Sequence, residues 1–425
     1  MMKRLPLLLA CFLLTACQDY EVAKLNGIPP QVIKSVHAAV DNQHRPGVVI
    51  GLLNPNGAYF YSYGVARSGT DKAISEQSQF SIGSLTKLFT AELFESLEKK
   101  GAVAQETLIS EIWPTVDDNA DTRLVHLASH TAGLPRDLPQ EVLTENSVDR
   151  LLAVLSRNAT LPSDYSYSSV GMAILGGSLG KVTDSSLKVE LNREVITPLQ
   201  LTGTGYEPDE EIIAARHQTT TPIESSVDVP EIAYGAGGLY STAEDLVSFL
   251  KAEMQQPVHL GWQHYQDQGF DAFYHGGDGN GHQAFIAFRP DNGVGVVLLS
   301  NSSSDDAFQD IALHLIDPRI ELPTFEHRPH QRLNKEELAL FVGNYRLLED
   351  DDSNRIELTL ADNRLIYHEL TADGETVRKT PLYTIDDKTF ELADVPVTIS
   401  FDSADIKSQA TLSFGDQVLT MVRGD

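Results

Sequence analysis

Four Ser-x-x-Lys spacings could each bring a serine hydroxyl beside a lysine amine, the pairing that activates a serine nucleophile. Residues three apart are neighbours on a helix, so each pair would have adjacent side chains in a helical segment. The pairs are Ser84/Lys87, Ser178/Lys181, Ser185/Lys188 and Ser248/Lys251. Because the spacing is short and recurs, it does not by itself identify a reactive serine.

The residues around Ser84 set it apart from the other three serines. It follows an apolar Phe80-Ser81-Ile82 and Gly83, and it precedes apolar residues at helical spacing up to Lys99-Lys100-Gly101. Ser84 is therefore predicted to open a helix, where free backbone N–H groups and the positive dipole end favour a developing oxyanion. Lys251, in contrast, is expected on a solvated helix face within Ala243–Met254. This context predicts Ser84 as nucleophile and Lys87 as its activating partner.

A second proton carrier is suggested by two tyrosines in Asp164-Tyr165-Ser166-Tyr167-Ser168-Ser169, just before a predicted helix. A neighbouring ammonium favours the phenolate, so we expect a tyrosine beside Lys87 to have a lowered pKa and to relay the serine proton. The alternative is a tyrosine pair that packs under the helix. The residues alone leave both interpretations open.

A glycine-rich segment, Phe273–Gly281, is the third candidate. Its glycines would let backbone approach a ligand closely, and His275 could titrate near neutrality and bind a substrate carboxylate or the tyrosine. The alternative is a loop that has glycines only for its turns. His275, Asp278 and His282 do not favour a metal site, and neither H-E-x-x-H nor paired C-x-x-C occurs, so we expect no metal and no cofactor.

The elements that would hold these residues indicate an α+β fold. A helix is predicted over Pro30–Asn42. Predicted strands lie near both ends of the first 320 residues, around the turn signals Asn54-Pro55-Asn56-Gly57 and Asp291-Asn292-Gly293. Helical patterns lie between these strands, which predicts an antiparallel sheet flanked by helices, with a helical subdomain. The remaining predicted helices are Ser147–Ser156, Val170–Leu179, Leu187–Val195, Ala243–Met254 and Asp305–Ile316.

After a proline-containing linker, predicted at 321–334, the pattern changes to eight short strands separated by Asp, Asn and Gly. This pattern predicts a small β-barrel or sandwich over 335–425, an accessory domain without nucleophile chemistry. The strands are predicted at Phe341–Leu348, Ile356–Leu360, Leu365–Leu370, Pro381–Ile385, Thr389–Leu392, Val397–Phe401, Gln409–Phe414 and Gln417–Val422.

The N-terminus is typical of a lipoprotein signal. Lys3 and Arg4 precede an apolar stretch, and Leu14-Thr15-Ala16-Cys17 resembles a bacterial lipobox. We expect removal of 1–16, lipidation of Cys17 and a tether over 17–29, and hence a bacterial cell-envelope protein that is anchored more readily to the outer membrane than to the inner one. An ordinary secretory signal is the alternative. The formal net charge of −28 argues against nucleic acid as a partner.

Six motifs in order resemble the class C β-lactamase-like serine hydrolases, which include D-Ala-D-Ala carboxypeptidases, penicillin-binding proteins and esterases. They are Ser84-Leu85-Thr86-Lys87, His130-Thr131-Ala132-Gly133-Leu134-Pro135, Tyr167-Ser168-Ser169, the segment Gly235–Thr242, His275-Gly276-Gly277 and the hairpin Pro290–Asn301. The resemblance covers about residues 30–316, within a catalytic domain predicted at 30–320. In addition, Phe341-Val342-Gly343-Asn344-Tyr345 resembles the start of the lipocalin-like domain attached to many such enzymes.

The resemblance implies that Ser84 is the nucleophile, Lys87 its partner and Tyr167 the general acid/base, with Tyr165 aligned to a leading aromatic. The N–H groups of Ser84 and Asp278 would form the oxyanion hole. Substrate-binding positions would be Ser169, His275, Gly277 and Asp278.

Two departures bear on the substrate. Ser169 stands where the family has asparagine, and His275-Gly276-Gly277 stands where it has Lys-Thr-Gly, so a carboxamide and a hydroxyl are lost. Both losses argue against an efficient β-lactamase. The sequence predicts an exported hydrolase that acts either on D-amino-acid peptides such as those of peptidoglycan or on small esters. The alternative of another class is a non-catalytic lipoprotein scaffold.

Overall fold

The computed structural model describes residues 27–425 except 117–120, 162, 224–228, 258, 268–269, 305–306, 326–332, 334, 349–354, 362–363, 372–373, 386, 393–394, 396, 402–408, 415–416 and 425. The predicted signal 1–16, Cys17, most of the tether 17–29 and most of the linker 321–334 lie outside the described residues. Within the described chain, no helix combines the length and the apolar character needed to cross a bilayer.

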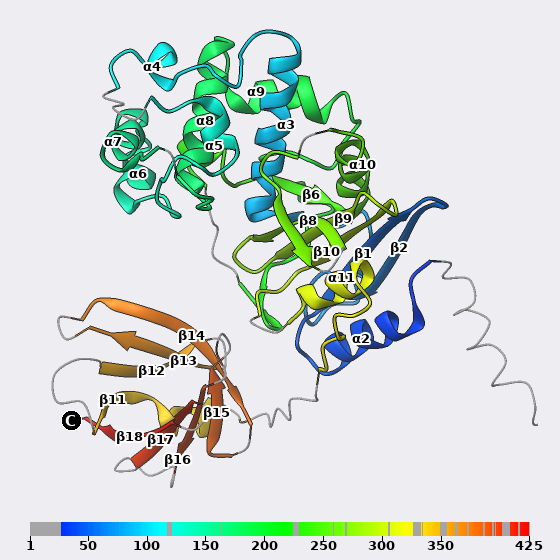
Figure 1. Cartoon of the computed structure of the whole chain (residues 1–425). Coiled ribbons are helices and arrows are strands. Elements are labelled where there is room, and N and C mark those ends of the chain that lie inside the picture. The colour runs from blue at the N-terminus through cyan, green and yellow to red at the C-terminus, as the bar shows by residue number, and fades with distance from the viewer. Residues whose placement is uncertain are drawn as a thin grey trace, which may run out of the picture.

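A six-stranded antiparallel sheet brings together strands from the two ends of residues 47–300 (Figure 1). Its order is β2-β1-β10-β9-β8-β7, and β1 pairs with β10 from Val48↔Ser300 to Leu53↔Gly295. The strands are β1 (Gly47–Asn54), β2 (Gly57–Gly64), β7 (Gln263–Asp267), β8 (Phe270–Asp278), β9 (Gln283–Arg289) and β10 (Val294–Ser300). The predicted union of N- and C-terminal strands in one sheet is therefore confirmed.

Strand β1 is buried on both faces, which explains its nearly continuous apolar run Gly47–Leu53. Alternate residues belong to different cores. Val48 and Ile50 pack in the core with α2 (Pro30–Asp41) and α11 (Gln309–Ile316), whereas Val49 packs in the core with α3 (Thr86–Lys99) and α10 (Ala243–Glu253). The sheet is thus a middle layer between two sets of helices.

The helical subdomain is inserted between β2 and β7 and lies beyond α3 from the sheet (Figure 1). Most of α3 is buried, with Leu88, Phe89 and Leu93 at 1% exposure or less. The helix ends where Gly101 takes a positive φ of 71°, as the glycine stop predicted. The other helices are α4 (Ile109–Ile112), α5 (Leu124–Ala128), α6 (Gln140–Glu145), α7 (Val148–Asn158), α8 (Ser169–Val182) and α9 (Leu187–Leu191).

The sequence-based predictions did not include β7 or the helices α4, α5 and α6, and two segments that were predicted are of another type. Helix α9 stops at Leu191 and continues as a π-helical turn over Asn192–Ile196, where one helix through Val195 was expected. The glycine-rich segment around His275 is not a loop before a strand, because β8 runs as far as Asp278. Its backbone pairs with β9 from Phe273↔Phe288 to Asp278↔Gln283. This pairing makes the segment a strand although glycine has a low strand propensity.

The C-terminal strands form a closed eight-stranded barrel in which β11 pairs with β18 (Figure 1). Its own core includes Phe341, Leu358 and Phe390, all 2% exposed or less. A barrel, rather than a sandwich, is the outcome. Its strands are β11 (Gly343–Leu347), β12 (Arg355–Ala361), β13 (Arg364–Leu370), β14 (Thr376–Thr384), β15 (Thr389–Leu392), β16 (Val397–Phe401), β17 (Gln409–Phe414) and β18 (Gln417–Arg423).

Candidate active site

Ser84 and Lys87 are in direct contact. Ser84 lies in the single 3₁₀ turn Gly83–Leu85, which continues into α3, and Lys87 Nζ donates a hydrogen bond of 2.9 Å to Ser84 Oγ. The lysine is 1% exposed, and burial together with the charge of Arg136 lowers its pKa to about 7 against an opposing effect of Asp137. At neutral pH the amine is therefore about half uncharged and can accept a proton.

The segment Gly235–Thr242 anchors Lys87 and the end of β3 (Gln79–Ser81) from the other side. Lys87 Nζ donates to the Ala236 carbonyl at 2.8 Å, and the Ile82 N–H donates to the Leu239 carbonyl at 2.9 Å. Strand β3 pairs with the short strand β6 (Tyr240–Thr242) next to these contacts. The sequence motif gave this segment no task; in the structure its Ala236 carbonyl positions Lys87.

Two glycines bring the turn at Ile82–Leu85 and β8 into backbone contact. A Cβ on Gly83, whose φ is +50°, would lie 2.2 Å from the Asp278 carbonyl oxygen, and one on Gly277 would lie 2.1 Å from the Ile82 carbonyl oxygen. Any side chain at either position would separate the two segments. The N–H groups of Ser84 and Asp278, predicted to form an oxyanion hole, thus belong to backbones that lie against each other.

Tyr167 is the tyrosine that lies at Ser84. Lys87 Nζ is 5.0 Å from the centroid of its ring. Burial raises the pKa of Tyr167 above its ordinary value, although a hydrogen bond with Ser84 and the charge of Arg136 act in the opposite direction. The expected lowering of this pKa was wrong, because burial outweighs the nearby cations. Tyr165 is 53% exposed and meets His130 edge-on instead.

His275 is fully buried beside this tyrosine, with ring centroids 5.7 Å apart. Its Nδ1 contacts the Gly276 carbonyl oxygen at 2.7 Å, while Nε2 has no hydrogen-bond partner among the described residues. Burial and the nearby Lys87 lower the pKa of His275 to about 3. The expectation that it titrates near neutrality was therefore wrong, since the ring is neutral at physiological pH.

A second buried histidine, which sequence reasoning did not single out, fixes the tyrosine segment. The Ser168 N–H donates to His130 Nδ1 at 3.1 Å, and the His130 carbonyl accepts from the Ser166 N–H at 2.8 Å. The Ser169 N–H likewise donates to the Arg136 carbonyl at 2.7 Å. These bonds tie the loop that follows α5 to the start of α8 and hold Tyr167 between them. The sequence motif His130–Pro135 marked this loop, but it did not indicate that His130 holds the tyrosine segment.

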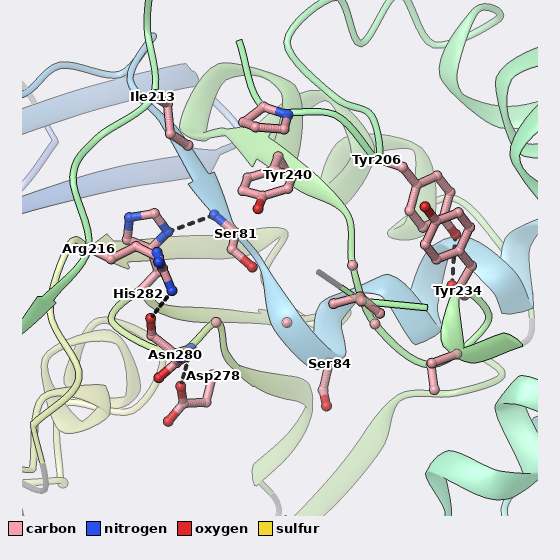
Figure 2. Close-up of a pocket in the computed structure, with 18 of the residues that line it drawn as sticks. Ser81, Ser84, Tyr206, Ile213, Arg216, Tyr234, Tyr240, Asp278, Asn280 and His282 are labelled. Carbon is pink, nitrogen blue, oxygen red and sulfur yellow. Dashed lines mark hydrogen bonds between the residues drawn. The ribbon is translucent and has the colours of Figure 1, made fainter. Parts of the chain in front are cut away.

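Ser84 opens into a cleft of about 950 Å³ that Ser169, Gly83 and Asp278 also line. Figure 2 shows the stacked rings of Tyr206 and Tyr234 on one side of Ser84, with centroids 4.1 Å apart. On the other side are Arg216, Asn280 and His282 (Figure 2). Tyr206, Tyr234 and Arg216 were not considered from the sequence, because the segments that carry them are far from Ser84 in the chain.

The other three serine–lysine pairs do not line this cleft, and their residues have other contacts. Ser178 Oγ accepts from Trp113 Nε1 at 2.9 Å. Lys188 forms an exposed ion pair with Glu207, and Ser248 donates to the carbonyl of Glu244 in its own helix. Of the four pairs, the structure thus places Ser84 and Lys87 in the cleft.

His282 has both ring nitrogens engaged. Its Nδ1 accepts from the Ser81 N–H at 2.8 Å and its Nε2 contacts the Ala214 carbonyl at 3.0 Å. Among the described residues, no group of three or more His, Cys, Asp or Glu side chains could hold a metal ion. His282 therefore ties β3 to the Ala214 segment, which explains its complete burial.

Fold and cleft together define a serine β-lactamase-like protein, and comparison with known sequences agrees. The Beta-lactamase family pattern matches residues 32–317. The chain therefore belongs to the Beta-lactamase family, a β-lactamase/DD-carboxypeptidase-like family of serine hydrolases.

Known proteins with similar sequences share about a quarter of their aligned residues with this chain. Penicillin-binding protein 4 of Amycolatopsis lactamdurans is 26% identical over 347 residues, which cover 67% of this chain and 91% of that protein. The D-alanyl-D-alanine-carboxypeptidase/endopeptidase AmpH of Escherichia coli (strain K12) is 24% identical over 221 residues, or 48% of this chain and 56% of that protein. The match to AmpH thus spans little more than half of the relative's length.

Solved structures share the fold. A class C β-lactamase from Rhodobacter sphaeroides superimposes with a TM-score of 0.61 at 20% identity, covering 69% of this chain and 99% of that one. A β-lactamase/D-alanine carboxypeptidase from Pseudomonas syringae gives 0.60 at 18% identity, covering 68% and 98%. At these identities the likeness establishes the fold alone.

Proposed function

We propose that this protein is an exported serine hydrolase that forms an acyl-enzyme on Ser84 and acts on D-amino-acid peptides or related amides and esters. The observation that carries the proposal is the 2.9 Å contact between Lys87 Nζ and Ser84 Oγ. The lysine in this contact has a pKa lowered to about 7 by burial. A buried amine near neutrality is the general base that a serine nucleophile requires.

In the acylation step, uncharged Lys87 accepts the Ser84 proton while Oγ attacks the substrate carbonyl. The oxyanion that forms is bound by the N–H groups of Ser84 and Asp278. Tyr167, whose raised pKa keeps it a neutral phenol, passes a proton to the leaving nitrogen or oxygen and regains one from Lys87. The bond to the leaving group breaks, and water then releases the acyl group by the reverse path.

Two substrate classes compete within this proposal. Loss of the asparagine carboxamide at Ser169 and of a hydroxyl at Gly276 favours a small ester, which has fewer polar groups to be held. A cell-envelope location beside peptidoglycan favours the peptide. A catalytically inactive scaffold is the remaining alternative, and it has no chemical need for the contact between Ser84 and Lys87.

The test is intact-mass analysis after exposure to a fluorophosphonate, with the modified residue mapped. We expect one adduct on Ser84, none in Ser84→Ala, and a melting temperature of that variant close to the wild-type value, because a half-buried cleft hydroxyl contributes little to stability. A folded wild-type protein without an adduct would favour the scaffold. Turnover of D-Ala peptides, β-lactams and short esters then distinguishes the substrate classes.

The anchor is a separate part of the proposal. Cleavage before Cys17 and acylation of its sulfur would place the enzyme on the envelope, with the outer membrane as the expected site. Mass analysis of the protein from membranes should show a lipidated N-terminal cysteine, and Cys17→Ala should release the protein from the membrane fraction. A wild-type protein without added acyl mass would indicate an ordinary secretory signal.

A further inference from the structure

His275, which was expected to bind a substrate carboxylate, carries no charge at neutral pH. His275 is fully buried, has Nδ1 against the Gly276 carbonyl and has a pKa of about 3. His130 is also buried, and burial lowers its pKa to about 4. Both rings are uncharged at neutral pH, and Gly276 has no hydroxyl to donate. Lys87 Nζ is engaged by Ser84 Oγ and the Ala236 carbonyl and acts as the base, so a carboxylate at Tyr167 would need a further cation.

Arg136 supplies a cation at this place. Its Cζ lies 4.9 Å from the centroid of the Tyr167 ring. The side chain is exposed, and no described residue forms an ion pair or hydrogen bond with its guanidinium. Its backbone is held, because the Arg136 carbonyl accepts from the Ser169 N–H at 2.7 Å at the start of α8. The guanidinium is thus positioned at the tyrosine while its N–H donors stay available.

The leaving group has to lie on the Tyr167 side of Ser84. A general acid acts only within hydrogen-bond reach of the atom it protonates, and Tyr167 is the acid in the proposed reaction. When the leaving group is a C-terminal amino acid, its carboxylate carbon is two bonds from the leaving nitrogen, each about 1.5 Å long. That carboxylate therefore comes to rest next to Tyr167, which is where the Arg136 guanidinium lies.

We propose that Arg136 binds the carboxylate of the leaving amino acid and makes this protein prefer substrates with a free C-terminus over neutral esters and amides. The inference rests on the proposed function, because it assumes that Ser84 is the attacking group. A guanidinium can contact an aromatic ring with its face and still bind a carboxylate through two N–H groups in its plane. Arg136 is then a specificity-determining residue outside the six motifs.

The experiment compares an acyl-D-Ala-D-Ala peptide with its C-terminal carboxamide, at one pH, so that any effect on Lys87 cancels in the ratio. We expect Arg136→Gln to lower kcat/KM for the free acid by at least about tenfold, mainly through KM, as loss of a charged hydrogen bond implies. The carboxamide should change less than about threefold, and Arg136→Lys should retain part of the preference. Arg157→Gln, which removes the same charge from an exposed position in α7, should leave the ratio unchanged. Equal losses on both substrates would overturn the proposal.

A binding measurement keeps the inference testable if neither peptide is turned over. Excess N-acetyl-D-alanine should raise the melting temperature of the wild type, and N-acetyl-D-alaninamide should not. The shift should disappear in Arg136→Gln and persist in Arg157→Gln. A shift that is the same in Arg136→Gln, or no shift in the wild type, would overturn the role of Arg136. Failure of the hydrolase proposal is recognised separately, by the absence of a Ser84 adduct.

Discussion

The reactivity of Ser84 should follow the titration of Lys87. Burial lowers the pKa of this lysine to about 7, and only the uncharged amine can take the serine proton. The uncharged fraction is about 9% at pH 6 and about 91% at pH 8, so the rate of fluorophosphonate labelling should rise about tenfold between them. A labelling rate that stays flat from pH 5.5 to 9 would refute the assignment of Lys87 as base.

The charge of Asp137 gives this prediction a direction that can be tested by mutation. Asp137 raises the pKa of Lys87 against the effect of burial, so Asp137→Asn should move the labelling midpoint to lower pH. At pH 6 the variant should then react faster than the wild type. Glu141→Gln removes the same charge from the exposed first turn of α6 and should leave the midpoint in place. A shift of Asp137→Asn to higher pH would contradict the reasoning.

Three further predictions concern other parts of the site and the core. Tyr167→Phe should lower turnover about 100-fold while the labelling midpoint stays near pH 7, because Lys87 sets it; a loss below about threefold would move the proton relay elsewhere. Gly277→Ala should cost about 2 kcal/mol in urea unfolding, since its Cβ would meet a carbonyl oxygen at 2.1 Å, whereas Gly177→Ala, with open space in α8, should stabilise by about 1 kcal/mol; equal effects would refute the contact. Burial raises the pKa of Glu95 from 4.5 to about 7. Its protonated form is favoured in the fold, so stability should fall as the pH rises from about 4.5 to about 7. Glu95→Gln should flatten this fall in pH-dependent unfolding, and an unchanged slope would contradict it.

Local patterns predicted most of the elements. The eight strands of the barrel were found because apolar and polar residues alternate between Asp, Asn and Gly turns, and these signals are local. Helix α3 was found from apolar spacing and the Gly101 stop. The strand through His275-Gly276-Gly277 was missed, because glycine has weak strand propensity and its pairing with β9 is a contact that local pattern does not carry.

The contact between Ser84 and Lys87 could be predicted from the sequence because the two residues are three apart, so that one helical turn determines it. Everything that acts on this pair comes from distant segments. The Ala236 carbonyl that anchors Lys87 is 149 residues away, and Gly277 reaches the turn from β8. These contacts depend on packing.

The sequence by itself determined which serine and lysine meet, most of the helices and strands, and that glycines stand where backbones must touch. Only the tertiary structure decided the protonation states. Burial raises the pKa of Tyr167 and lowers that of His275, contrary to what their residue types and a neighbouring lysine indicated. The physical reason is that a pKa depends on how much water is excluded around a group and which charges surround it. Those surroundings are assembled from segments that only the fold brings together.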